Sequence, residues 1–318
     1  LASRPETDMF YISIGTIQAF ITYSKQFTRP INEIANQYAQ IQSALAGAER
    51  VFDVMDSEPE DQGGNEPFEI ENVKGDLNFK DIDFSYVKGE QVLKHFDLWV
   101  KSGQKIAIVG ATGSGKTTVV NLLTRFYDID GGVITLDGQD IRNIPVNKLR
   151  GSIGIVLQDT VIFSDTIAQN IRYGRIDATD EEIVEAAKIA RVDDFASKLS
   201  DGYNTMLTEG GSNLSQGQRQ LISIARAVLA DPKILILDEA TSSIDTRTEM
   251  HIQEAMVALM KGRTSLIIAH RLSTIRDADK IVVISGGKVV EAGDHDELLA
   301  QKGEYYKLYQ SQFAGIAT

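Results

Sequence analysis

The stretch Gly110–Thr117, which reads GATGSGKT, decides how the rest of this 318-residue chain is interpreted. A glycine, four residues and then glycine, lysine and threonine is the spacing of a phosphate loop. The apolar run Lys105–Val109 predicts a buried strand before it, and Thr118–Arg125 has helical apolar spacing after it. Glycines let successive N–H groups turn inward towards phosphate oxygens, and the helix start adds its positive dipole end. The stretch therefore predicts a nucleotide phosphate site; the alternative is a glycine-rich turn without a ligand.

We expect this loop and the start of its helix to hold ATP together with Mg²⁺. Lys116 brings a full positive charge and counts among the catalytic candidates, and Thr117 offers its hydroxyl to the metal. The residues expected to contact the nucleotide are Gly110, Thr112, Gly113, Ser114, Gly115, Lys116, Thr117 and Thr118.

The run Ile234–Glu239, ILILDE, is the expected partner of the phosphate loop. An apolar strand that ends in Asp238 places a carboxylate at the carboxyl edge of the sheet, where α/β proteins bind ligands. Asp238 is therefore a candidate Mg²⁺ ligand. Glu239 follows directly and is the candidate base or water-positioning residue for in-line attack. The alternative is a pair of acids that favours a helix N-terminus.

Composition excludes some classes of protein. The net charge is −13, which argues against a general nucleic-acid binder but not against a nucleotide site with a few local donors. The chain has no cysteine, so it has neither disulfides nor thiol chemistry, as suits a cytosolic compartment. It starts at Leu1 rather than Met and shows no signal peptide, so we expect a fragment or a processed product.

The first part of the chain is organised differently from the rest. Met9–Tyr23 has no charge, but it is shorter than the roughly 20 residues of a membrane span. Lys25 and Arg29 follow, as at a cytoplasmic membrane edge, so we favour the end of a transmembrane helix over a buried helix. Pro30–Met55 has amphipathic helical spacing and predicts a long stalk, and Ser57–Pro67 predicts a linker.

From Gly75 onward the pattern is that of a mixed α/β domain. Leu77–Tyr86 alternates like a strand, and short apolar strands then alternate with helical segments, which predicts a parallel core sheet. Further strands are expected at Ile153–Leu157, Ser265–Ala269 and Lys280–Ile284. Helices are expected at Asp177–Ser200, Ser215–Leu229, Thr246–Met260 and Asp296–Phe313.

Several further motifs occur in a fixed order around the phosphate loop and the run Ile234–Glu239. Leu214–Gln218 reads LSQGQ and resembles the LSGGQ signature, and Ser242–Asp245 resembles an aspartate loop. Gln158 follows a strand as a glutamine-loop residue does, His270 resembles a switch histidine, and Tyr86 resembles an adenine-stacking residue. Together these motifs make residues from about Phe79 to Gln312 similar to the nucleotide-binding domain of an ATP-binding cassette (ABC) transporter.

The resemblance implies a phosphate-loop NTPase cassette with a mixed sheet core, an antiparallel β subdomain and an α-helical signature subdomain, preceded by a long helix. It implies that residues 1–58 end a transmembrane domain, that 59–74 are a linker and that 75–318 are the cassette.

It also implies roles for single residues. Tyr86 stacks on adenine, Gln158 ligates Mg²⁺ beside Thr117 and Asp238, and His270 holds Glu239 and the attacking water in register. The partner cassette's ATP is contacted in trans by Ser215, Gln216, Gly217 and Asp245.

Three features resemble exporters in particular: the apolar helix in the same chain, Thr208–Gly211 before the signature, and Leu93–Val100 after Tyr86. The function implied is an ATPase engine that couples cassette dimerisation to export. Its partners are a second half-transporter, the coupling helices of its own transmembrane domain and the membrane. The cassette would lie on the cytoplasmic side of a bacterial cell membrane. Drugs, lipids and peptides are all compatible substrates.

One signature position departs from the family pattern. Gln216 stands where the family usually has glycine, and its side chain would crowd the partner's γ-phosphate. With Glu239 and His270 intact, this resembles the catalytic half of a heterodimeric exporter; a homodimer with harmless variation is the alternative. Other functions remain as alternatives: a regulatory ATP-binding module that closes but barely hydrolyses ATP, a soluble ABC ATPase of DNA repair or translation, and an importer ATPase.

Overall fold

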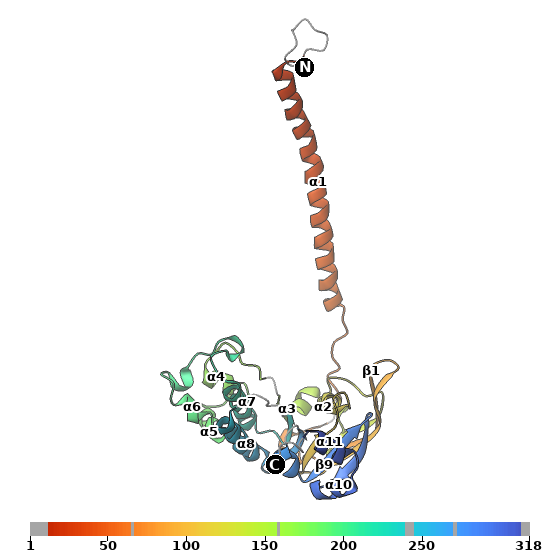
Figure 1. The fold of residues 1–318 in the computed structure, drawn as a ribbon, viewed down its shortest axis with the longest axis vertical. Coiled ribbons are helices and arrows are strands. Elements are labelled where there is room, and N and C mark those ends of the chain that lie inside the picture. The colour runs from red at the N-terminus through yellow and green to blue at the C-terminus, as the bar shows by residue number, and fades with distance from the viewer. Residues whose placement is uncertain (1–11, 65–66, 158–159, 239–244, 270–271, 313–318) are drawn as a thin grey trace. The chain divides into compact units, whose positions relative to one another are not determined.

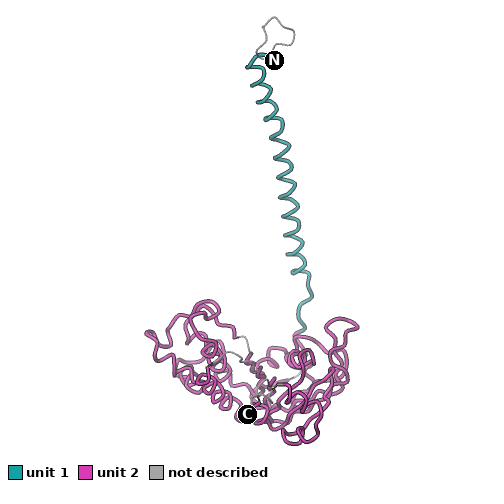
Figure 2. The backbone as a smooth tube through the Cα atoms, in the orientation of Figure 1, with its two compact units in different colours: residues 1–61 teal, residues 62–318 magenta. Residues whose placement is uncertain are grey.

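The computed structural model describes residues 12–64, 67–157, 160–238, 245–269 and 272–312. The chain divides into two compact units, Leu1–Asp61 and Gln62–Thr318, which Figure 2 colours separately. The second unit begins inside the segment predicted as a linker, and Phe68 and Val73 from that segment are buried in it. The domain boundaries proposed from the sequence stay predictions.

The first unit contains one long helix, α1, at Ile14–Met55. It has 42 residues, which corresponds to about 63 Å at the usual rise per residue. Ser13 caps its start by accepting a hydrogen bond from the Thr16 N–H at 3.1 Å. The predicted long helix is therefore confirmed. In the described residues no helix is both long and apolar enough to cross a bilayer. Part of Met9–Tyr23 lies outside the described residues, so the membrane segment stays a prediction.

The described residues of the second unit form two sheets (Figure 1). The antiparallel sheet has the strand order β2-β1-β4-β5, and the larger sheet has the order β10-β9-β3-β8-β7-β6. In the larger sheet β9, β3, β8, β7 and β6 are parallel and β10 is antiparallel to β9, so the predicted mixed sheet is confirmed. The strands are β1 Leu77–Val87, β2 Glu90–Val100, β3 Lys105–Val109, β4 Gly131–Leu136, β5 Gln139–Asp140, β6 Ile153–Val156, β7 Ile234–Asp238, β8 Thr264–Ile268, β9 Lys280–Ser285 and β10 Lys288–Gly293.

Five of the helices, α4 to α8, gather in a helical lobe beside the sheets (Figure 1), in which α7 packs against α4, α5 and α8. This lobe is the predicted helical subdomain. The helices of the unit are α2 Lys116–Leu123, α3 Val146–Gly151, α4 Ile167–Arg172, α5 Asp180–Ile189, α6 Asp193–Ala196, α7 Gln216–Ala230, α8 Thr246–Met260, α9 Leu272–Arg276, α10 His295–Gln301 and α11 Glu304–Gln312.

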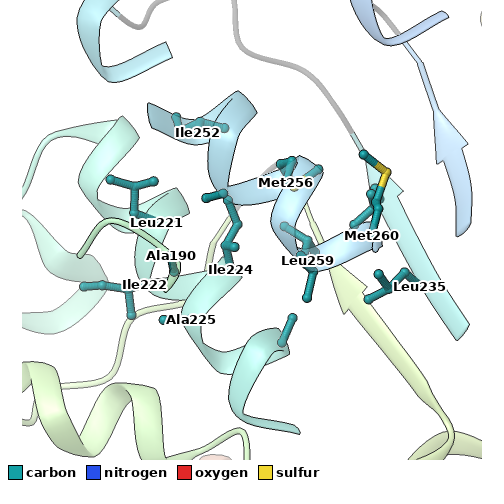
Figure 3. Close-up of a cluster of buried hydrophobic side chains, with 14 of the residues drawn as sticks. Ala190, Leu221, Ile222, Ile224, Ala225, Leu235, Ile252, Met256, Leu259 and Met260 are labelled. Atoms are coloured by element: carbon teal, nitrogen blue, oxygen red, sulfur yellow. The ribbon is translucent and has the colours of Figure 1, made fainter. Parts of the chain in front are cut away.

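The larger sheet is covered on both faces, which explains why its strands are nearly continuous apolar runs. Alternate residues of β3 belong to different cores: Ile106 and Ile108 face one, and Ala107 and Val109 face the other. Figure 3 shows the second core, in which residues of α7 and α8 pack against each other, with Leu235 of β7 nearby. The side chains labelled there are Ala190, Leu221, Ile222, Ile224, Ala225, Leu235, Ile252, Met256, Leu259 and Met260.

The predictions of two helices are wrong, because in the structure each of these segments forms two shorter helices. The expected helix Asp177–Ser200 is α5 and α6, because Arg191 between them has a φ of 58°. The expected tail helix Asp296–Phe313 is α10 and α11, separated at Lys302, whose φ is 52°. A Cβ on the following Gly303 would lie 1.9 Å from Glu291 Oε1. That carboxylate accepts hydrogen bonds from the first N–H groups of α11, so the break is built into the packing.

Candidate functional site

The phosphate loop lies between β3 and α2, as its sequence predicts. Gly115 has a φ of 109°, in the left-handed region that favours glycine, and caps the start of α2. A Cβ on Gly110 would lie 2.3 Å from the carbonyl oxygen of Ile284. A Cβ on Gly115 would lie 2.7 Å from Leu93 Cδ2. Both glycines are therefore required by the loop's close approach to β2 and β9.

A cavity of about 460 Å³ opens beside this loop. That volume falls within the range of small-molecule sites. Its lining combines residues that are far apart in the sequence, namely Tyr86, Val92, Thr112, Gly113, Gly115, Lys116, Thr117, Thr118, Asp238 and Ile268. The structure thus brings six of the predicted loop residues together with Tyr86 and Asp238, whereas the predicted Gly110 and Ser114 do not line the cavity. The sequence did not predict Val92 or Ile268 as site residues, because they reach this cavity only through the order of the strands in the sheets.

Lys116 is held by its own loop. Its Nζ donates hydrogen bonds to the carbonyl oxygens of Gly110 at 2.8 Å and Ala111 at 2.9 Å. Partial burial lowers the pKa of Lys116, and the negative charge of Asp238 opposes that shift. A partly buried ammonium at the start of a helix is a group whose charged form an anionic ligand stabilises.

Ser114 provides a second sign that the loop fits a phosphate. Its hydroxyl is buried, and it has no hydrogen-bond partner in the described structure. A buried hydroxyl without a partner costs about 1–3 kcal/mol. A phosphate oxygen is an acceptor that would satisfy it. The residues present in this loop therefore fit a phosphate group.

Asp238 ends β7, which lies between β6 and β8 in the parallel part of the sheet. Because β3 also runs parallel to β8, the carboxyl ends of β3 and β7 meet at one edge of the sheet. This arrangement explains how Asp238 reaches the same cavity as Thr117. The described residues contain no cluster of three or more His, Asp or Glu arranged for a metal ion. A carboxylate and a hydroxyl nevertheless suit Mg²⁺, which takes few protein ligands when substrate phosphates supply the others.

The ring of Tyr86 lies at this cavity, among other aromatic rings. It makes edge-to-face contacts with Phe84 and Tyr127, with ring centroids 4.8 and 5.0 Å away. Its hydroxyl lies 3.2 Å from Thr118 Oγ1 and accepts a hydrogen bond from Asn121 Nδ2 at 3.1 Å. Asn121 and Tyr127 were missed by the sequence argument. Asn121 could have been found, because it follows Thr118 by three residues on the same face of the helix.

The predicted signature residues lie elsewhere and do not line the phosphate-loop cavity. Ser215 caps α7 by accepting a hydrogen bond from the Gln218 N–H at 3.2 Å, and Gln218 Oε1 accepts one from the Ser215 N–H at 2.9 Å. Gln216 is the first residue of α7, and Gly217 is buried. This geometry leaves Ser215 at an exposed helix start, which suits an anion.

Asp245 caps α8 in a similar way, by accepting a hydrogen bond from the Thr248 N–H at 3.0 Å. That hydrogen bond lowers the pKa of Asp245, so the carboxylate is charged at neutral pH. Gln158, Glu239 and His270 lie outside the described residues, as does the rest of Ser242–Asp245. Their roles stay predictions.

Comparison with known proteins now gives the family. Residues 93–242 match the sequence model of the family described as ABC transporter. The chain is 56% identical over 303 residues to an uncharacterised ABC transporter ATP-binding protein of Bacillus subtilis, covering 95% of this chain and 50% of that protein. It is 53% identical over 297 residues to a fatty acid ABC transporter ATP-binding/permease protein of Mycobacterium tuberculosis, covering 93% and 47%. It is 48% identical over 299 residues to an ATP-dependent lipid A-core flippase of Syntrophus aciditrophicus, covering 94% and 50%.

A solved structure agrees with these matches. A bacterial Atm1-family ABC exporter with ATP bound superposes with a TM-score of 0.76 at 39% identity, covering 93% of this chain and 52% of the exporter chain. The chain therefore contains an ABC transporter ATP-binding domain, of a family of ATPases coupled to transport, and it has the ABC cassette fold. Membership of this family implies that the chain binds ATP. The chain spans about half of the length of the curated relatives that it matches.

Proposed function

We propose that this chain is the ATP-binding and ATP-hydrolysing engine of an ABC exporter. The observation that carries the proposal is the cavity beside the phosphate loop, where Lys116, Thr117, Asp238 and Tyr86 meet. The exporter class is supported by the named relatives, which are ATP-binding/permease and flippase proteins, and by the superposed exporter.

In this proposal the phosphate loop binds the ATP phosphates through its N–H groups and the Lys116 ammonium. Tyr86 stacks on the adenine ring. Thr117, Asp238 and Gln158 would hold Mg²⁺. When bound, this ion would neutralise negative charge on the phosphates. Glu239 accepts the proton of the attacking water, and His270 positions that water.

The strands that precede Gln158, Glu239 and His270 support this arrangement. They are β6, β7 and β8, which are parallel neighbours in the larger sheet. Residues just beyond the carboxyl ends of neighbouring parallel strands share one edge of the sheet. Three polar residues that follow three adjacent strands are thus expected on the side of the sheet where Asp238 lies.

We further propose that a second cassette completes the site. Ser215 and Gly217 start α7 away from the phosphate-loop cavity of their own chain, which suits contact with the γ-phosphate of a partner's ATP, together with Gln216 and Asp245. The partner is a second half-transporter. We favour a different chain, since the Gln216 side chain would crowd that phosphate. Coupling helices of the transmembrane domain, in a bacterial cell membrane, are the other proposed partner, with the cassette on the cytoplasmic side.

Two substitutions test the engine. Lys116→Ala should weaken Mg²⁺-ATP binding by about tenfold or more, because a full charge is removed from the phosphates. Glu239→Gln should keep ATP affinity within about threefold and lower turnover by about 100-fold or more, since general-base catalysis contributes about 100- to 10,000-fold. Binding is measured by calorimetry and turnover by phosphate release.

The outcomes separate the alternatives. Unchanged ATP affinity in Lys116→Ala would overturn the phosphate-loop assignment, and unchanged turnover in Glu239→Gln would remove Glu239 from the mechanism. If the unsubstituted chain, joined to its transmembrane domain, binds ATP but shows no measurable ATP turnover, a regulatory module is favoured over an ATPase engine.

A further inference from the structure

The chain enters the second unit through a segment that is fastened to the cassette. This entry segment comprises residues 62–64 and 67–73, and its last part contains the short 3-10 helix η1 at Ile70–Asn72. Phe68 and Val73 are buried in the core to which the apolar residues of α2 also belong. The described parts of the entry segment therefore pack against the same core as the helix that follows the phosphate loop.

Two glycines allow the entry segment to approach the backbone between β5 and α3. The Gly64 N–H donates a hydrogen bond to the carbonyl oxygen of Arg142 at 3.0 Å. A Cβ on Gly64 would lie 2.5 Å from the carbonyl oxygen of Asn143, and a Cβ on Gly63 would lie 2.3 Å from that of Ile144. Backbone atoms cannot turn aside as a flexible side chain can, so a side chain at either position would displace the segment.

Arg125 holds the same stretch of backbone and follows the C-terminal end of α2. Its residue is 6% exposed, and its Nη1 donates long hydrogen bonds to the carbonyl oxygens of Ile141 at 3.5 Å and Arg142 at 3.4 Å. The Arg142 carbonyl oxygen thus accepts from both Arg125 and Gly64. A Cβ on Gly63 would also lie 2.8 Å from Arg125 Nη1. The entry segment and the end of α2 are therefore joined through one carbonyl group.

Helix α3 makes a second connection between the same two parts, and it lies beside α2 (Figure 1). Arg150 of α3 donates hydrogen bonds from Nε to the Thr124 carbonyl oxygen at 3.0 Å and from Nη2 to the Arg125 carbonyl oxygen at 2.9 Å. A cation at the C-terminal end of a helix is also favoured by the helix dipole. Lys148, two residues earlier, donates from Nζ to the Phe68 carbonyl oxygen at 2.8 Å. Helix α3 thus binds α2 with one side chain and the entry segment with another.

We propose that the entry segment and α2 open as one cooperative unit, so that a ligand on the phosphate loop stabilises the entry segment. The phosphate loop precedes α2, and Arg125 and Arg150 are positioning residues that join the other end of α2 to the entry segment. A ligand that binds only the ordered form of a unit stabilises all of that unit by mass action. Because the ordered form predominates, the affinity for the ligand itself should change little when the connection is cut.

The entry segment follows α1 in the chain, so this connection gives the nucleotide a covalent route to α1. The route is separate from the coupling helices proposed above, which would act through non-covalent contacts. Its use in transport rests on the proposed function. The connection between α2 and the entry segment does not, and it can be tested without nucleotide.

The first test compares hydrogen exchange in the nucleotide-free parent chain and in Gly64→Ala. Peptides that cover residues 119–126 report on the end of α2, where the Thr124 and Phe126 N–H groups donate hydrogen bonds at 3.0 and 2.9 Å. We expect their exchange to be about fivefold faster in Gly64→Ala, the effect of losing about one hydrogen bond, because the displaced entry segment no longer holds Arg125. Unchanged exchange of these peptides would overturn the proposal.

The matched control is Gly131→Ala in β4. A Cβ on Gly131 would lie 3.6 Å from Asp83 Cβ, an ordinary contact, so this alanine has room. Its exchange over residues 119–126 should stay within about twofold of the parent, as for most substitutions away from a critical contact. Equal acceleration in both variants would reveal a general loss of stability and overturn the proposal. If Gly64→Ala does not fold by circular dichroism, Lys148→Met replaces it, because the Lys148 side chain is exposed.

The second test adds Mg²⁺ and a non-hydrolysable ATP analogue at about ten times its dissociation constant. Peptides that cover residues 67–73 report on the entry segment, where the Asn72 and Val73 N–H groups donate hydrogen bonds at 3.1 and 3.2 Å. We expect the analogue to slow their exchange about fivefold in the parent, within the roughly tenfold limit that mass action sets. Arg150→Lys keeps the charge but loses the fork, so most of the slowing should disappear.

Calorimetry on the same chains separates this proposal from the proposed function. We expect Arg150→Lys to bind the analogue within about threefold of the parent, because the phosphate loop is intact. If the analogue binds the parent and the exchange of residues 67–73 does not change, the connection is overturned and the ATPase engine stands. If the analogue does not bind, the proposed function fails, and the nucleotide-free comparison alone decides whether α2 and the entry segment are connected.

Discussion

At the scale of single residues, the contacts of Tyr86 show how its side chain is held at the phosphate-loop cavity. Phe84 and Tyr127 contact its ring, and Asn121 donates a hydrogen bond to its hydroxyl. The side chain nevertheless remains 44% exposed, so a part of it is accessible to a base. Support from three neighbours lowers the conformational entropy that a free tyrosine would lose on stacking.

The ring and the hydroxyl of Tyr86 can be separated by substitution. Tyr86→Ala should lower ATP affinity by about tenfold, since base–aromatic stacking is worth about 1–3 kcal/mol. Tyr86→Phe keeps the ring and should stay within about threefold, because one hydrogen bond contributes only about 1 kcal/mol. Titration with a fluorescent ATP analogue measures both. If Tyr86→Ala binds as well as the parent, the ring does not stack on adenine.

At the scale of elements, reciprocal caps fix the helix starts that the proposed function uses. Ser215 and Gln218 form a capping box on α7, and Thr179 and Glu182 form the same motif on α5. The two helices pack against each other in the helical lobe. Only the α7 cap belongs to the predicted signature, so the α5 cap is a matched control.

We expect removal of either helix cap to cause a similar loss of stability, but the two removals to have different effects on ATP turnover. Ser215→Ala and Thr179→Ala should each lower the free energy of unfolding by about 1 kcal/mol, because each removes one helix cap. Only Ser215→Ala should also reduce ATP turnover of the assembled transporter. Urea unfolding and phosphate release measure the two effects. An equal loss of turnover in Thr179→Ala would make the role of Ser215 purely structural.

At the scale of the whole molecule, self-association of the chain distinguishes a homodimer from a heterodimer. The Glu239→Gln chain should stay monomeric with Mg²⁺-ATP, since Gln216 would crowd the γ-phosphate of an identical partner. Adding Gln216→Gly removes that side chain and should give a dimer with Mg²⁺-ATP and a monomer with Mg²⁺-ADP. Light scattering measures the mass in each state. A dimer of the parent Glu239→Gln chain with ATP would show that the chain pairs with itself and favour the homodimer.

Much of the cassette could be predicted from local patterns. The spacing of Gly110–Thr117, the apolar strand ending at Asp238 and the helical spacing of Ser215–Leu229 each depend on residues close in the chain. Phosphate loops, buried strands and helix caps are set by backbone geometry within a few residues, and for that reason a single sequence reveals them.

Contacts between distant segments were decided only by the tertiary structure. Val92 and Ile268 reach the phosphate-loop cavity because β2 and β8 lie beside the loop, although they are far from it in sequence. A cavity between α6, α7 and α8 likewise joins Lys198 to Arg247 through the packing of the helical lobe. The order β10-β9-β3-β8-β7-β6 is not the order of the chain. Pairing of strands and helices over long separations depends on the summed burial of whole faces, which no local motif encodes.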